Sequence, residues 1–169
     1  MKCNRLTLLI VPIFFLCSCS MFSSGSKDSK SAPPPQEYKK GGIAFDITAD
    51  LQLNRYKNTP HALQLCLYQL RDPNAFNQLA DDPNSLAKLM ECGKFDSSIS
   101  YAKRIVVQPG QKLSEKLDMA EGTRFIGIAT GYFSAGNEKK THLAPVTGRS
   151  TTNLAIELGS NEISSVTVK

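Results

Sequence analysis

The sequence is poor in the residues and motifs that carry chemistry. It has only two histidines, His61 and His142, and no tryptophan. Glycine-rich phosphate loops, nucleophile elbows, His-Glu zinc helices and paired-cysteine metal motifs are all missing. Neither histidine stands at a spacing typical of metal ligands. We therefore predict a protein that is not an enzyme and that binds no cofactor, metal ion or small-molecule substrate.

A strong excess of one charge is also missing. The 20 basic and 15 acidic residues give a formal net charge of +5. Removal of Lys2 and Arg5 with the leader described below lowers it to +3 (5 − 2 = 3). Because both signs are mixed along the chain, as on an ordinary solvated surface, nucleic acid is not an expected partner. The length suits one domain with its own core.

No apolar run is long enough to cross a bilayer. The N-terminal run, residues 6–16, is about half as long as the roughly 20 residues that a spanning helix needs. It follows two basic residues and precedes a polar stretch, which is typical of a secretory signal peptide. We predict that residues 1–18 form this signal peptide.

The end of the leader has the pattern of a lipobox. Leu16 and Ser18 stand at positions −3 and −1 relative to Cys19, and Ser18 is the small residue that a lipoprotein peptidase requires. Cys17 fits poorly as the acceptor, because Leu16 would then occupy its −1 position. We predict acylation at Cys19. Ser20, rather than Asp, follows the acceptor and favours the periplasmic face of the outer membrane.

The remaining cysteines form an even pair. Of the five, Cys3 and Cys17 would leave with the signal peptide, and Cys19 would carry lipid. Cys66 and Cys92 would then share an oxidising compartment, for which we predict a disulfide. Two buried reduced thiols are the alternative.

Residues 19–42 are predicted to be a lipidated flexible linker. They contain a Ser/Gly-rich stretch at 23–26 and three consecutive prolines at 33–35, and they offer almost nothing apolar to bury. The folded domain is predicted to span residues 43–169.

Alternating and continuous apolar segments predict a mainly β domain. The expected strands span residues 43–53, 62–70, 102–107, 113–119, 125–133, 154–158 and 163–168. The second is apolar on nearly both faces, as expected for a central strand. The pattern indicates a β-sandwich of seven or eight strands with a short helical insertion.

Two short helices are expected between the second and third strands. Asp72-Pro73 and Asp82-Pro83 have the chemistry of an N-cap followed by an N1 proline, and predict helices near residues 73–80 and 83–91. Gly93 would end the second helix. The side chains expected to face inward are Phe76, Leu79, Leu86, Leu89 and Met90.

Several of these segments together carry a family resemblance. They are the lipobox, the strand ending at residues 51–54, the segment Leu-Cys-Leu-Tyr-Gln-Leu-Arg-Asp-Pro-Asn-Ala-Phe at 65–76, the turn at 107–110 and the glycine-bearing strand at 126–132. Over roughly residues 43–135 the chain resembles the outer-membrane lipoprotein family of the type VI secretion system, TssJ.

This resemblance implies a fold, a transthyretin-like or immunoglobulin-like β-sandwich with a helical addition, and it implies a function as well. Members anchor an envelope-spanning secretion complex at the outer membrane by binding the periplasmic C-terminal part of the IcmF-like inner-membrane subunit, TssM. The family binds through the loop that joins its first two strands. In this chain that loop comprises Asn54, Arg55, Tyr56, Lys57, Asn58, Thr59 and Pro60.

Other interpretations are open at this point. The chain could be an accessory lipoprotein of another envelope machine, such as a pilotin or a barrel-assembly partner, or an envelope hydrolase with a dispersed site. For the loop itself, a tyrosine between Arg55 and Lys57 has the composition of an interface hot spot. The simpler alternative is a solvated hairpin connection.

Overall fold

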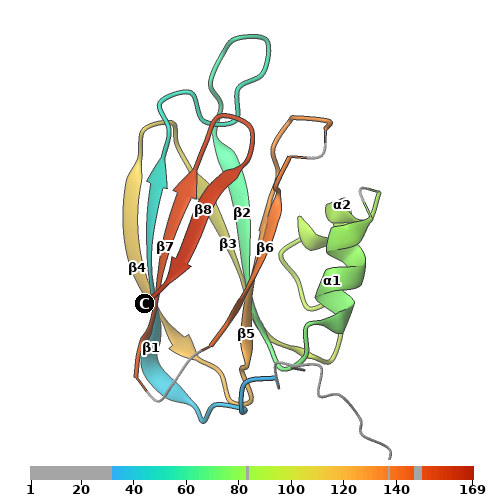
Figure 1. Cartoon of the computed structure of the whole chain (residues 1–169), viewed down its shortest axis with the longest axis vertical. Helices are drawn as coiled ribbons and strands as arrows, with labels where there is room; N and C mark the ends of the chain where they lie inside the picture. Colours follow the sequence, from blue (N-terminus) through green and yellow to red (C-terminus); the bar gives the residue numbers. More distant parts are fainter. Residues whose placement is uncertain (1–31, 83, 137, 147–149) are drawn as a thin grey trace, which may run out of the picture. The chain divides into compact units, whose positions relative to one another are not determined.

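The computed structural model of the chain describes residues 32–169, apart from residues 83, 137 and 147–149. The described residues form two four-stranded sheets, ordered β4-β1-β7-β8 and β3-β2-β5-β6, with two short helices on the outer side of the second (Figure 1). The elements are β1 (Lys39–Ala49), β2 (Leu63–Leu70), α1 (Asn74–Asp81), α2 (Leu86–Leu89), β3 (Ile99–Val107), β4 (Lys112–Met119), β5 (Phe125–Thr130), β6 (Thr141–Pro145), β7 (Thr152–Leu158) and β8 (Ile163–Val168). The predicted β-sandwich with a helical insertion is confirmed.

The main core lies between the two sheets. In β1, Ile43, Phe45 and Ile47 are at most 1% exposed, and the residues between them face outward. The same alternation occurs in β7, which pairs with β1 in parallel, whereas the other paired strands are antiparallel. Period-two alternation therefore delivers one apolar face from each strand to this core.

Strand β2 is buried on both faces. Leu65 and Leu67 point into the core between the sheets. Cys66 and Tyr68 point the other way, into a second cluster beneath the helices. The helices therefore explain why the sequence of β2 lacks the alternation of a strand with one solvated face.

Strand β1 has different ends from those predicted. It begins at Lys39, within the residues assigned to the linker, and ends at Ala49 rather than at residue 53. The chain turns at Asp50, whose carbonyl accepts a hydrogen bond from Leu53 N (3.1 Å). This turn leaves Leu51 76% exposed while Leu53 returns to the core. The apolar alternation through residue 53 therefore does not mark a continuous strand.

The segment before β1 is fixed to the turn between β4 and β5. Gln36 N donates to Thr123 O (3.1 Å), and Gly122 N donates to Gln36 O (2.7 Å). The Asp118 carboxylate accepts from Gly41 N (2.8 Å). This backbone hydrogen bond is the main reason that the pKa of Asp118 lies below its usual range. The chain thus has a defined point of entry at the start of β1.

The residues that begin the two helices, and the residue that follows the second, differ from the prediction. Pro73 occupies the N-cap position of α1, and Ser85 occupies the N-cap position of α2. Neither side chain makes a capping hydrogen bond. Pro83 lies outside the described residues. Cys92, with φ +52°, takes the left-handed position after α2 that was assigned to Gly93. In the described part of the chain, no helix has the length and apolar content needed to span a membrane.

Helix α1 sits close to the sheet because β5 offers a glycine beneath it. Phe76 is 1% exposed and lies over Gly127, where an added Cβ would come within 2.8 Å of the ring. Leu89 is also buried, and Leu79, Leu86 and Met90 pack partly buried around this cluster. The five side chains predicted to face inward therefore do so.

Strand β6 was not predicted. It has only five residues and ends in Pro145, and it pairs with β5 at the edge of its sheet. A proline is tolerated there because an edge strand has backbone groups that need no partner strand.

Candidate functional site

Four connections gather at one end of the sandwich, which we call the loop end. They are the β1–β2 connection (50–62), the β3–β4 turn (108–111), the β5–β6 connection (131–140, of which residue 137 is not described) and the β7–β8 turn (159–162). Figure 1 shows the β1–β2 connection projecting furthest, in teal, beyond the ends of the strands. All seven residues of the predicted partner-binding loop belong to this connection.

The tip of this connection is a two-residue hairpin. Tyr56 N donates to Thr59 O (2.9 Å), and Thr59 N donates to Tyr56 O (3.0 Å). Between them Lys57 and Asn58 have φ values of +48° and +63°. Two consecutive positive φ angles define a type I′ turn, which matches the twist of a hairpin. The tip is therefore a preformed structure rather than a loose loop.

Asn54 joins two of the connections from beneath. It is 2% exposed, and its Oδ1 accepts from Phe133 N (2.9 Å) while its Nδ2 donates to Ala62 O (3.0 Å). Its φ of +49° is a conformation that Asn tolerates better than most residues. The Asn54 side chain is therefore buried beneath the predicted loop, and its part in partner binding stays a prediction.

The β7–β8 turn is tied into the same platform. Arg55 N donates to Ser160 O (2.9 Å). The Tyr132 hydroxyl has one proton to donate and lies within hydrogen-bond distance of two carbonyls, Gly159 O (3.1 Å) and Glu162 O (2.9 Å), and burial raises the pKa of this phenol above its usual value. These bonds hold three connections in one arrangement.

Three aromatic side chains meet on this platform: Tyr56, His61 and Phe133, which we call the aromatic cluster. The Tyr56 and Phe133 ring centroids are 5.3 Å apart, and His61 lies 5.5 Å from Phe133 and 6.3 Å from Tyr56. Tyr56 is 48% exposed and Phe133 56% exposed. Lys57 places its Nζ 5.4 Å from the centre of the Tyr56 ring. The cluster is therefore an exposed apolar surface beside a cation.

Most of the predicted loop is available to a partner. Arg55, Tyr56, Lys57, Asn58 and Thr59 are exposed, and Pro60 is partly buried. Sequence reasoning missed Phe133, which was placed in the strand over 125–133. Tyr132 and Phe133 are adjacent, so in an extended chain they face opposite sides, and burial of Tyr132 turns Phe133 outward. The opposite orientation of these two adjacent residues was the feature of the sequence that could have identified Phe133.

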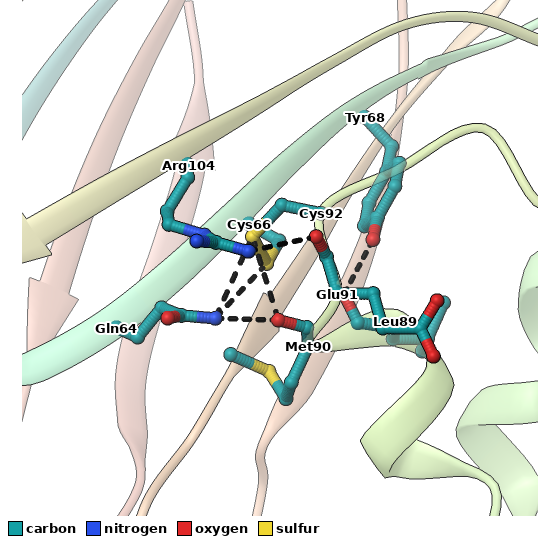
Figure 2. The surroundings of a disulfide bond; sticks show 8 residues. All are labelled: Gln64, Cys66, Tyr68, Leu89, Met90, Glu91, Cys92 and Arg104. Carbon is teal, nitrogen blue, oxygen red and sulfur yellow. Dashed lines mark hydrogen bonds between the residues drawn. A yellow bond between two sulfur atoms is a disulfide. The ribbon is translucent and has the colours of Figure 1, made fainter.

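The predicted cysteine pair lies away from the loop end, under the helices. The structure has a disulfide between Cys66 on β2 and Cys92 after α2, with Cα atoms 5.2 Å apart (Figure 2). This separation lies within the range that the bond requires. The bond links a central strand directly to the end of the helical insertion.

Side chains from the sheet bind three consecutive carbonyls at the end of α2 (Figure 2). They are the Tyr68 hydroxyl to Leu89 O, Gln64 Nε2 to Met90 O (2.5 Å) and Arg104 Nη2 to Glu91 O (2.9 Å). Burial is the main cause that raises the pKa of Tyr68 to about 12, so its hydroxyl remains a donor. These bonds satisfy carbonyls that a helix end leaves without partners.

Two further predictions bear on other parts of the chain. Cys19, with residues 1–31, lies outside the described residues. Among the residues that are described, no three His, Cys, Asp or Glu side chains are placed to hold a metal ion.

Fold and loop end together define a β-sandwich domain with a preformed surface at one end. A family model described as type VI secretion lipoprotein (VasD, EvfM, TssJ) matches residues 42–161. The chain belongs to this family. None of the curated proteins matches the sequence.

Solved structures share the fold at low identity. The type VI secretion lipoprotein TssJ1 from Pseudomonas aeruginosa is 21% identical with a TM-score of 0.65, covering 81% of this chain and 98% of that one. Serratia marcescens Lip, a membrane-bound component of the type VI secretion system, is 18% identical with a TM-score of 0.60. The match covers 81% of this chain and 98% of that one. A structure described as the TssM C-terminal domain from EAEC is 18% identical with a TM-score of 0.59, and the match covers 75% of this chain and 96% of that one.

Proposed function

We propose that this lipoprotein anchors the type VI secretion membrane complex at the periplasmic face of the outer membrane. In this proposal it binds the periplasmic C-terminal part of the IcmF-like subunit TssM through its loop end. Family membership supports the secretion role. Structures with the same fold include one described as the TssM C-terminal domain and one described as a type VI membrane complex, which makes TssM a reasonable partner.

The observation that carries the proposal is the position of the loop end relative to the predicted anchor. Cys19 precedes β1 in the chain, and the β1–β2 connection directly follows β1. Strand β1 has 11 residues and therefore separates its two ends by about 35 Å. The predicted tether enters the domain at Lys39, and the preformed aromatic surface lies at the far end of that strand. A subunit that reaches out from the inner membrane would meet the surface there.

The lipid anchor is tested with a Cys19→Ala variant. Because the anchor is separated from the domain by the linker, the variant should fold normally and lose membrane attachment. Detergent phase partitioning of the full-length protein from its own host measures this. A variant that still partitions as an amphiphile would show that Cys19 is not the acylated residue.

Binding through the loop end is tested with Tyr56→Ala. An aromatic side chain at the centre of an interface typically contributes about 2 kcal/mol or more, so the dissociation constant for the TssM periplasmic domain should rise about 30-fold. Melting temperature should change little, because Tyr56 is half exposed. Tyr101→Ala is the matched control, since Tyr101 is an exposed tyrosine on β3 outside the loop end. Equal affinity for the two variants would exclude Tyr56 from the interface.

A further inference from the structure

Exposed apolar side chains are concentrated at the loop end. Among the described residues, six large hydrophobic side chains are exposed, and three of them, Leu51, Tyr56 and Phe133, belong to loop-end connections. Leu51 lies over the backbone of Gly110, where an added Cβ would come within 2.8 Å of its side chain. It therefore covers the β3–β4 turn. Tyr56 and Phe133 instead contact each other, although they come from connections 77 residues apart (133 − 56 = 77).

Two exposed cations, Arg55 and Lys57, flank this pair. Among the described residues, neither Arg55 nor Lys57 forms an ion pair. Two carboxylates of the loop end, Asp50 and Glu162, accept hydrogen bonds from backbone N–H groups, of Gln52 (2.6 Å) and Lys139 (3.2 Å) respectively, and neither is paired with Arg55 or Lys57. The exposed surface therefore combines apolar rings with two cations, Arg55 and Lys57, that form no ion pair among the described residues.

We propose that Phe133 and Tyr56 act as one composite clamp for a single apolar side chain of the partner, flanked in the partner by carboxylates that face Arg55 and Lys57. This inference rests on the function proposed above and adds to it a second loop, a second contact residue and the chemistry of the bound segment. An aliphatic or aromatic residue within an acidic stretch is the segment that fits both the rings and the cations.

Preorganisation supports this assignment. The backbone of Phe133 is held by Asn54 Oδ1, and the backbone of Tyr56 is held in the tip hairpin. Neither ring needs its main chain to be ordered when a partner arrives, so the entropy lost on binding is small. A pair of exposed rings fixed in this way is an apolar patch of the kind that marks interaction sites.

The test measures affinity for the TssM periplasmic domain by titration calorimetry, together with melting temperature. The variants are Phe133→Ser, Tyr56→Ala and the double variant. Val106→Ser is the matched control, because Val106 is 53% exposed on β3 and lies outside the loop end. Phe133→Ser should weaken binding at least 10-fold with an unchanged melting temperature, and Val106→Ser should leave affinity unchanged. Phe133→Ala replaces Phe133→Ser if the serine variant is less stable.

A composite clamp also predicts non-additive effects. Once one ring is removed, loss of the other should weaken binding by a smaller factor than it does in the wild-type protein. If the double variant weakens binding by the product of the two single factors, the rings make separate contacts, and the clamp is overturned. Weakening by Tyr56→Ala but not by Phe133→Ser would also overturn it while leaving the proposed function intact. Unchanged affinity in all variants would reject both.

The bound segment is tested by charge reversal. Arg55→Glu and Lys57→Glu should each weaken binding further at low salt than at high salt, because screening removes the repulsion from partner carboxylates. A loss that is the same at both ionic strengths would rule out the acidic character of the segment.

Discussion

Two long excursions leave the sandwich, and they are fixed to it in opposite ways. The helical excursion, residues 71–98, buries Phe76 and Leu89 against β2 and β5 and is joined to β2 by the Cys66–Cys92 disulfide. The β1–β2 connection, residues 50–62, buries little beyond Leu53 and Asn54 and is held mainly by hydrogen bonds.

This difference separates stability from recognition. The helical excursion places its rings inside, where they add to the folding free energy. At the loop end two rings remain exposed on a hydrogen-bonded base, where they are available to a partner. If the comparison is right, variants of the first region should change stability alone, and variants of the second should change affinity.

The largest expected effect comes from removing the disulfide. Replacing Cys66 and Cys92 together by Ala opens a loop closed over a sequence separation of 26 residues, which should lower the free energy of unfolding by about 3 kcal/mol. Urea unfolding measures this, and the wild-type protein under reducing conditions provides a second way to remove the bond while keeping both side chains. Affinity for the TssM periplasmic domain should be unchanged. A parallel loss of affinity would mean that the two regions are coupled.

A smaller loss of stability, accompanied by weaker binding, is expected from Asn54→Gly. The substitution allows the left-handed φ but leaves Phe133 N and Ala62 O without their partner, which should cost about 2 kcal/mol. Asn58→Gly is the control, because Asn58 also has a positive φ but is exposed. The control should be nearly neutral in both urea unfolding and affinity. Similar losses in the two variants would assign the effect to the backbone and not to the Asn54 amide.

The smallest expected effect is a pH dependence on the loop-end side of β6. Burial is the main cause that lowers the pKa of His142, so the unfolded chain binds a proton at a higher pH than the folded one. Stability from this group is complete above pH 6.5 and is lost as pH falls through the lowered value. The unfolding free energy should therefore decrease between pH 7.5 and 5.5, and less so in His142→Asn. An identical slope in the variant would assign the pH dependence to another group.

The predictable parts of the fold were those with a strong local pattern. Continuous apolar sequence in β2 indicated burial on both faces; the sheet that contains β1 covers one face and the helices cover the other. The positions of Phe76 and Leu89 followed from helical spacing. Strand β6 gave no comparable signal, because it has only five residues and its apolar side chains, Leu143 and Ala144, pack into different core clusters.

The candidate site was only partly predictable. Tyr56 and its basic neighbours could be located, because a polar connection with one tyrosine is conspicuous in the sequence. The role of Asn54 and the contribution of Phe133 depend on a contact across 79 residues, which no local pattern encodes. The turn at Asp50 also needed the structure, since Leu51 and Leu53 continue the alternation of β1 although the strand has ended.

The placement of β1 has a mechanical consequence. The chain enters this strand at Lys39, after the segment fixed to the β4–β5 turn, and leaves it at Ala49 into the connection that carries the aromatic cluster. A pulling force applied between the predicted tether and the loop end would therefore run along the covalent backbone of a strand that is already extended. The other strands lie beside this load path rather than in series with it. Tension could rise along β1 without first separating the two sheets.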